Sequence, residues 1–144
     1  MNKQEIARVL EEIATLLELK GENPFRVRAY RNGARALLNI EEDLDKVINK
    51  LTEYEGIGDH IAEKITELFK TGKLTYYEKL KANTPKGLLE LMQVPGLGPK
   101  KVQMLYQKLK IKNIDELKKA AKKREISEIE GFGKKTEQNI LQSL

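Results

Sequence analysis

A three-residue turn made of glycine, a large apolar residue and glycine occurs three times in this chain of 144 residues. The three copies are Gly56-Ile57-Gly58, Gly96-Leu97-Gly98 and Gly131-Phe132-Gly133. Each copy has apolar residues two and five positions before its first glycine, and apolar residues at helical spacing resume directly after it. Successive first glycines are separated by 40 and then 35 residues. Self-similarity of this kind predicts one short structural unit that is built three times.

Glycine is useful in such a turn because it reaches positive φ without a Cβ clash and lets another backbone come close. The apolar residue between the glycines can point inward and fix the turn. Backbone N–H groups at the start of the following helix have no intrahelical acceptor, and the helix dipole places partial positive charge there. The turns are therefore candidate phosphate sites. A short connection between two core helices is the structural alternative.

Two features of the charge distribution point to a polyanionic partner. Lysines occupy the first turn of the helices that follow the second and third turns, where the helix dipole disfavours a cation; they are Lys100, Lys101, Lys134 and Lys135. An external phosphate would compensate for this placement. Residues 85–144 carry 13 basic and 7 acidic residues, and the segment Pro24–Arg35 holds four arginines without an acid. Such clusters suit a nucleic acid, although a solvated helix surface would look similar.

Composition excludes several other classes of function. Cysteine is absent, and His60 is the single histidine, so neither a disulfide framework nor an all-side-chain zinc site is expected. The N-terminal segment carries acids throughout and has no long apolar run, which excludes a signal peptide and a membrane span. We expect a soluble cytoplasmic protein without a membrane partner.

Apolar residues recur at helical spacing along nearly the whole chain, and strand signals are almost absent. The fold class is therefore all-α. Helices are expected at about residues 3–19, from Pro24 onward, and at 43–51, 59–70, 74–82, 86–92, 99–109, 113–123, 125–129 and 134–144. The apolar positions of the second helix include Phe25, Ala29, Ala36 and Leu37. Because Asn, Thr, Pro and Gly cluster in Lys81–Gly87, we expect two small helical bundles, 1–83 and 84–144.

The three turns resemble the helix-hairpin-helix motif of DNA repair and replication proteins. That motif grips the backbone of duplex or gapped DNA without reading bases, and two consecutive copies often pair into a compact unit. The resemblance implies such a unit from the second and third copies here. In the third copy, Glu137 stands where the motif usually has a small residue.

Three longer stretches, "NPFRVRAYRNGARAL", "IAEKITELFKTGKL" and "VPGLGPKKV", together resemble the N-terminal region of family X DNA polymerases. The resemblance covers the whole chain, as a lyase-type 8-kDa domain followed by a fingers-like domain. Nothing in the chain resembles the Asp-x-Asp metal site on a strand that is typical of the polymerase palm, so nucleotidyl transfer by this chain alone is not expected. The helix at the C-terminal end favours a fragment cut before the palm over a stand-alone relative. The function implied is sequence-independent DNA binding in DNA repair.

The resemblance also implies site residues in the first bundle. The lyase nucleophile of the family, a lysine that forms a Schiff base with an abasic sugar, falls on Lys64, and a nearby family tyrosine falls on Tyr30. The 5′-phosphate pocket falls on Arg26 and His60. Since His60 and Lys64 are four residues apart, they share one face of their helix.

Two further points concern the first bundle: one more expected DNA contact, and an alternative role for Lys64. The arginine-rich segment adds Arg28 to the expected DNA contacts. Lys64 could instead be an ordinary surface lysine that pairs with Glu63 or Glu67, an interaction worth about 0–1 kcal/mol.

In the family, backbone carbonyls of the hairpins hold a monovalent cation, K⁺ or Na⁺, that bridges to phosphate. The corresponding carbonyls here belong to Thr52, Tyr54, Ile57, Met92, Val94 and Leu97. No other cofactor is expected. The DNA partner implied is gapped, nicked or a junction of single strand and duplex, bound by a monomer that associates with the nucleoid in a prokaryote. The alternative is a stand-alone, non-catalytic module for DNA or protein interaction.

Overall fold

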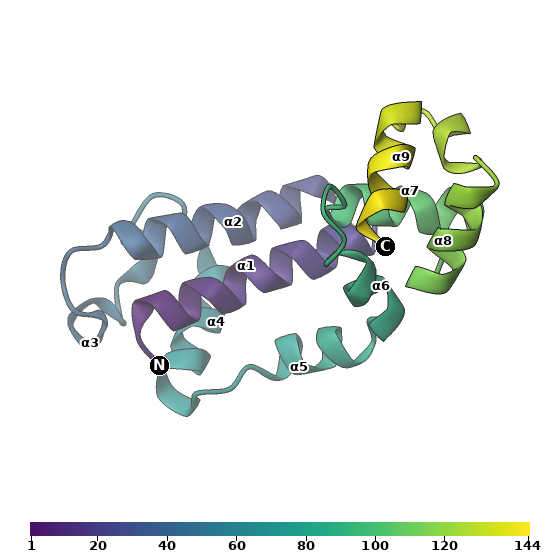
Figure 1. Ribbon diagram of the computed structural model, residues 1–144. Helices are drawn as coiled ribbons and strands as arrows, with labels where there is room; N and C mark the ends of the chain where they lie inside the picture. Colours follow the sequence, from purple (N-terminus) through teal and green to yellow (C-terminus); the bar gives the residue numbers. More distant parts are fainter. The chain divides into compact units, whose positions relative to one another are not determined.

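The computed structural model describes all residues from Met1 to Leu144, and it is helical throughout, without strands (Figure 1). The chain divides into two compact units, Met1–Ala82 and Asn83–Leu144. The expectation of an all-α fold is therefore confirmed. The expected boundary, after residue 83, lies one residue beyond the one observed.

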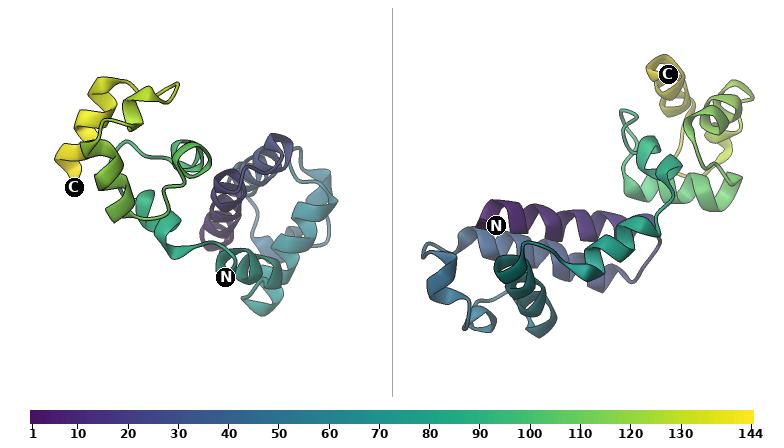
Figure 2. Two further views of the ribbon diagram at one scale, coloured as in Figure 1. Left: turned by 90° about the vertical axis from the view of Figure 1, so that its right-hand side faces the viewer. Right: turned by 90° about the horizontal axis from the view of Figure 1, so that it is seen from below.

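The first unit contains five α-helices and one 3₁₀ helix: α1 (Lys3–Leu19), α2 (Pro24–Asn39), α3 (Leu44–Val47), η1 (Leu51–Glu53), α4 (Asp59–Thr71) and α5 (Thr75–Ala82). The long helices α1 and α2 run side by side in every view (Figure 2). Both begin at an asparagine cap, since Asn2 accepts a hydrogen bond from the Glu5 N–H at 2.8 Å and Asn23 accepts one from the Phe25 N–H at 2.8 Å. Helix α4 contacts both long helices and closes the core.

The face that α2 buries includes only part of the expected apolar positions, of which Leu37 is fully buried. Phe25 is 73% exposed and Ala29 is also exposed, whereas Val27 and Tyr30 are buried. The reason is that helix packing follows the 3-4-3 spacing from Val27 through Tyr30, and Phe25 lies two positions before Val27, which places it on the other side of the helix. Helix α2 also crosses α4 closely, because a Cβ added at Gly33 would lie 2.7 Å from an Ile61 methyl group.

The helix expected at residues 43–51 is shorter in the structure. Helix α3 ends at Val47, and the 3₁₀ helix η1 begins at Leu51. Lys50 lies between them with φ −135° and ψ 28°, outside the helical region. Val47 and Leu51 are nevertheless both buried, so the apolar spacing located the core positions correctly but not the break that starts the first hairpin.

The second unit contains four short α-helices and one 3₁₀ helix: α6 (Lys86–Leu91), α7 (Pro99–Leu109), α8 (Ile114–Lys122), η2 (Ile126–Glu128) and α9 (Lys134–Ser143). Its most buried side chains include Leu91, Leu105 and Leu117. The start of α6 lies directly against the segment before α8, since a Cβ at Gly87 would be 2.0 Å from the Lys112 carbonyl oxygen. No helix in either unit has the length and apolar character to cross a membrane.

Candidate nucleic-acid interface

The three glycine turns are built from the same backbone hydrogen bonds. In each, the middle apolar residue donates its N–H to the carbonyl three positions earlier: Ile57 to Tyr54 at 3.2 Å, Leu97 to Val94 at 3.0 Å and Phe132 to Ile129 at 3.0 Å. The first helical bond after each turn runs back to its second glycine: Ala62 to Gly58 at 2.9 Å, Val102 to Gly98 at 3.0 Å and Glu137 to Gly133 at 3.1 Å. The middle residues are buried, as the sequence predicts. The repeat in the sequence is therefore a repeat in structure.

The two glycines of each turn do different things. The first glycines, Gly56, Gly96 and Gly131, have φ values of 96°, 87° and 91°, a region in which other residues are strained. The second glycines, Gly58, Gly98 and Gly133, have ordinary extended φ values of −87°, −94° and −96°. A Cβ added at any second glycine would meet no atom within 4 Å. The fold thus requires glycine only at the first position, and positive φ does not account for the second.

Each second glycine is the N-cap of the helix that follows, and none of these helices has a side-chain cap. The first N–H groups of α4, α7 and α9 therefore have no side-chain acceptor. The missing Cβ leaves open space beside these donors. This arrangement can receive an acceptor from outside the chain, such as a phosphate oxygen.

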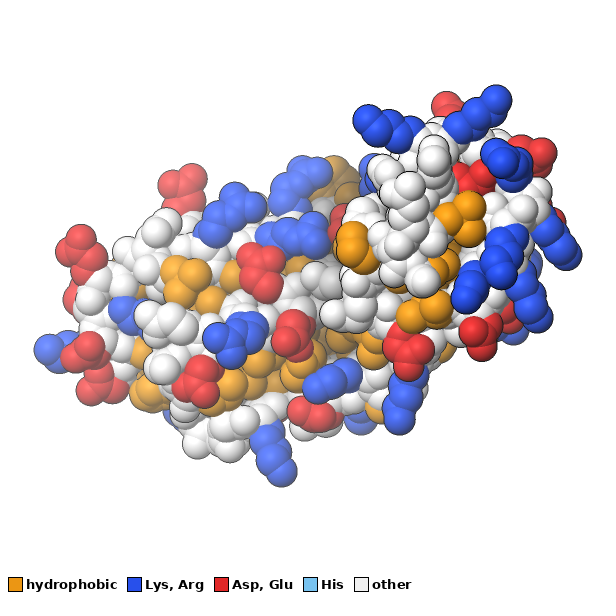
Figure 3. Space-filling view, viewed as in Figure 1, with side chains coloured by type: hydrophobic (Ala, Val, Ile, Leu, Met, Phe, Trp, Pro, Cys, Tyr) orange, Lys and Arg blue, Asp and Glu red, His pale blue; other side chains and the backbone are white.

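The predicted lysines lie at two of these helix starts. Lys100, Lys134 and Lys135 are exposed, while Lys101 is half-buried with its Nζ 5.9 Å from the centroid of the Phe132 ring. None of the four forms an ion pair. The first hairpin differs, because its helix begins with Asp59. Lys and Arg side chains are prominent over the second unit in the space-filling view (Figure 3).

Glu137 in the third hairpin is buried, with only 3% of its surface exposed. Its carboxylate accepts a hydrogen bond from the Ser127 N–H at 2.9 Å, so it satisfies a backbone donor at η2. The departure from the usual small residue is therefore structural, and the turn itself keeps the geometry of the other two.

The carbonyls expected to hold a monovalent cation lie on the turns of the first and second hairpins. Those of Tyr54 and Val94 already accept a hydrogen bond from within the turn, and each keeps a second lone pair. No cluster of three or more His, Cys, Asp or Glu side chains is arranged to hold a metal ion. The cation site stays a prediction.

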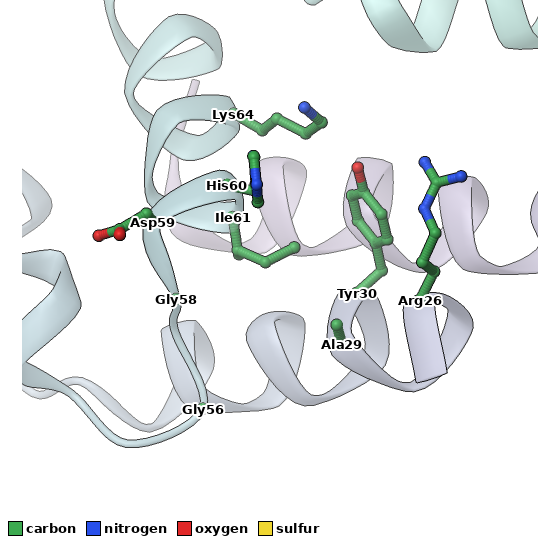
Figure 4. Close-up of a pocket in the computed structure, with 9 residues that line it drawn as sticks. All are labelled: Arg26, Ala29, Tyr30, Gly56, Gly58, Asp59, His60, Ile61 and Lys64. Atoms are coloured by element: carbon green, nitrogen blue, oxygen red, sulfur yellow. The ribbon is translucent and has the colours of Figure 1, made fainter. Parts of the chain in front are cut away.

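A pocket of about 340 Å³ lies between α2, the first hairpin and α4 (Figure 4). Its lining consists of Arg26, Ala29, Tyr30, Gly56, Gly58, Asp59, His60, Ile61 and Lys64. The fold thus brings together Arg26, Tyr30, His60 and Lys64, although two come from α2 and two from α4. Figure 4 shows the polar ends of Lys64, Tyr30 and Arg26 turned to the same side, with the Asp59 carboxylate turned away.

Lys64 has no carboxylate partner. The alternative of an ion pair with Glu63 or Glu67 is not seen, and the Glu67 carboxylate instead accepts the Thr75 N–H at 3.1 Å. The Lys64 ammonium lies 4.7 Å from the centroid of the Tyr76 ring, within cation–π range.

Tyr76 does not line the pocket itself, but it contacts three of the residues that do. Its ring stacks on Tyr30, with centroids 6.3 Å apart and an interplanar angle of 7°. Its hydroxyl accepts a hydrogen bond from Arg26 Nη2 at 2.9 Å. Tyr76 therefore contacts Tyr30, Arg26 and Lys64 at once. Spacing within one helix cannot signal these contacts, because Tyr76 is on α5 and meets residues of α2 and α4 only through the tertiary fold.

Burial raises the pKa of Tyr30 well above its usual range, and the neighbouring Tyr76 raises it further, while Arg26 acts in the opposite direction. The phenol therefore stays protonated at neutral pH, so that it can donate a hydrogen bond to an anion but cannot serve as a phenolate base. Arg26 also lies 3.7 Å from the Glu22 carboxylate.

The remaining arginines of α2 have different surroundings. Arg31 is paired with α1 through Glu18 at 3.2 Å and Glu11 at 3.8 Å, which gives it a structural role. Arg28 is exposed, does not line the pocket, and lies 5.5 Å from the centroid of the exposed Phe25 ring. The arginine-rich segment is therefore not a single cationic surface.

Comparison with known families agrees with this geometry. Residues 1–74 match the helix-hairpin-helix domain family, and residues 88–144 match the SAM-like helix-hairpin-helix tandem. The chain belongs to the helix-hairpin-helix domain family. The tandem match confirms that the second and third hairpins form one paired unit.

Over all of its 144 residues, the chain is also 40% identical to the DNA polymerase/3'-5' exonuclease PolX of Bacillus subtilis (strain 168). The match confirms the expected similarity to the N-terminal region of a family X DNA polymerase. The chain spans 25% of the length of that relative.

Proposed function

We propose that this chain is a sequence-independent DNA-binding module of a family X polymerase, acting on gapped or 5′-phosphorylated DNA in repair. The observation that carries the proposal is the open second glycine of each hairpin. At three equivalent places the chain leaves helix-start N–H groups uncapped and the space beside them empty. The helix dipole favours an anion at each of these places.

The lysines support phosphate as that anion. Lys100, Lys101, Lys134 and Lys135 oppose the dipole of their own helices unless a negative charge lies nearby. Contacts of this type bind the DNA backbone and carry no base information. Binding should therefore weaken steeply with salt and depend little on sequence.

The pocket of the first unit supports a preference for a 5′-phosphate. Arg26, Lys64 and the neutral Tyr30 hydroxyl supply donors on one side of it, and His60 adds a further polar group. Phe25, on the same helix, exposes an aromatic face on which an unpaired base of a gap can stack. A phosphate site and an exposed stacking face on the same helix fit a gap better than an intact duplex.

A second candidate function is deoxyribose-phosphate lyase activity through Lys64, favoured by the lack of any carboxylate partner for its amine. In that reaction the neutral amine attacks C1′ of the ring-opened abasic sugar and water leaves, which forms a Schiff base. Water then takes up a C2′ proton while the C3′–O bond breaks and the 3′-phosphate leaves, and hydrolysis of the Schiff base frees Lys64. The protonated Tyr30 would hydrogen-bond the sugar phosphate rather than accept that proton.

One series of titrations tests these functions. Fluorescence anisotropy would follow binding of the full chain to gapped DNA with and without a 5′-phosphate, at several salt concentrations and in two unrelated sequences. We expect a preference for the phosphorylated gap that Arg26→Ala removes. Arg35→Ala is the matched control, since Arg35 is exposed on the same helix but does not line the pocket.

The outcomes separate the alternatives. A strong sequence preference, or an affinity insensitive to salt, would contradict backbone binding. Weak DNA binding under all conditions would favour a protein-interaction module. Borohydride trapping on abasic-site DNA would then test the lyase: a covalent adduct that survives Lys64→Ala would remove Lys64 from the nucleophile's role.

A further inference from the structure

The hairpins account for only part of the positive charge of the second unit. Five other basic residues form a group that we call the α8 basic surface: Lys118, Lys119, Lys122, Lys123 and Arg124. All five are exposed, and none forms an ion pair. The opposite face of α8 buries Leu117, Ala120 and Ala121, and the helix packs against α9 and η2. Figure 3 shows basic side chains projecting into solvent over this part of the unit.

This concentration of charge is unfavourable within the free chain. Lys118 and Lys122 are four residues apart on α8, and Lys119 is four residues before Lys123, the C-cap residue. Like charges at that spacing repel each other. The negative end of the helix dipole offsets part of this repulsion for lysines in the last turn. Lys118 lies too early in the helix to benefit fully. The two acids of the helix, Asp115 and Glu116, form no ion pair with any of them.

Arg124 supplies an independent observation. It follows the end of α8 with φ 60°, and its N–H donates to the Ala121 carbonyl at 3.1 Å. Glycine is the preferred residue at such a left-handed helix end; the chain uses Gly21 and Gly72 in that conformation after α1 and α4, but another basic residue, Lys110, after α7. At Arg124 a positively charged side chain is kept in a conformation that glycine would adopt with less strain.

The charge spacing fits a duplex. At 1.5 Å per residue, the segment from Lys118 to Arg124 spans roughly 9 Å and carries five positive charges. Each strand of duplex DNA carries about one negative charge per 3.4 Å of axis, and so about three over the same length, which leaves at least one of these charges for each phosphate of the facing strand. We propose that the α8 basic surface binds a segment of nucleic-acid backbone separate from the phosphates held at the hairpins. The proposal rests on DNA being the partner of the hairpins.

The first test neutralises the surface. A full-length variant carrying Lys118→Gln, Lys119→Gln, Lys122→Gln and Lys123→Gln would be compared with wild type for duplex binding across salt concentrations. The slope of log affinity against log salt is negative, and each lost phosphate contact makes it less steep by about 0.9. We therefore expect the slope of this variant to be less steep than that of wild type by about 2 to 4. The matched control changes four lysines of the first unit to glutamine, Lys46, Lys70, Lys73 and Lys79, and should keep the wild-type slope.

The second test uses opposite effects on stability and binding. We expect Arg124→Gly to raise the thermal midpoint, because glycine relieves the left-handed strain, and to lower the salt slope by about 1. Arg124→Lys keeps the charge and should keep the slope. If the arginine served only the helix end, Arg124→Gly would leave DNA binding unchanged.

Three results would overturn the proposal: wild-type slopes in both α8 variants, an equal loss in the first-unit control, or a lower thermal midpoint of the lysine variant without a change in slope. The last result would assign these lysines to the helix dipole alone. Failure of the proposed function is distinguishable, because wild type itself would then show no salt-dependent DNA binding. Retained wild-type binding with an unchanged α8 variant removes only this inference.

Discussion

The open second glycine of each hairpin gives the sharpest test of the interface, and Gly98→Ala is the simplest perturbation. Gly98 has φ −94° and ψ 179°, which alanine adopts readily, and the added Cβ would meet no atom within 4 Å. Alanine is a poorer N-cap than glycine, but it also reduces the entropy of the unfolded chain. These opposing effects should leave the free energy of unfolding within about 1 kcal/mol of wild type.

Binding should respond differently, because the new methyl group occupies the space through which a phosphate reaches the first N–H groups of α7. A hydrogen bond to a charged group contributes about 1.5–3 kcal/mol. Loss of one such bond therefore predicts an affinity for gapped DNA about 10- to 100-fold lower. Anisotropy titration measures the affinity, and thermal unfolding followed by circular dichroism measures the stability.

Gly96→Ala is the matched control in the same turn. Gly96 has φ 87°, so alanine there is strained and should destabilise the unit by about 1–2 kcal/mol. The two variants separate a glycine required by the fold from one left open for a ligand. Wild-type affinity in Gly98→Ala, or a stability loss equal to that of Gly96→Ala, would refute the assignment.

Three further predictions concern the pocket and the core. Tyr76→Phe removes the hydroxyl that accepts from Arg26, and should reduce the preference for a 5′-phosphate several-fold while duplex affinity, measured in the same titration, stays unchanged. Gly87→Ala places a Cβ 2.0 Å from the Lys112 carbonyl oxygen and should destabilise the second unit by about 2 kcal/mol or more in a denaturant titration; wild-type stability would mean that the segment moves freely. Because the pKa of Tyr30 is raised in the folded state, the unfolded chain loses this proton first as pH rises above about 10. Stability should therefore fall above that pH, and an equally steep fall in Tyr30→Phe would exclude this tyrosine as a cause.

Much of the fold follows from the sequence because it is local. Apolar spacing located α1, α4, α7 and α9 closely, and the glycine repeat located all three turns, since both signals depend on neighbouring residues. The sequence-based expectations differed from the structure where two local patterns compete for the same residues. The third helix ends at Val47, and Lys50 leaves the helical region before the hairpin begins. Phe25 is turned to solvent because the stronger spacing from Val27 determines the buried face.

The pocket shows which features of the site patterns within one helix cannot predict. By itself the sequence determined the repeated turn, the helical class and the residue types that suit a phosphate. Only the tertiary structure decided that Tyr76 on α5 lies against Lys64 and Tyr30, and that Arg31 is neutralised by α1 while Arg26 faces the pocket. The physical reason is that these contacts join residues far apart in the chain. Their geometry depends on how helices pack, which no spacing rule within one helix contains.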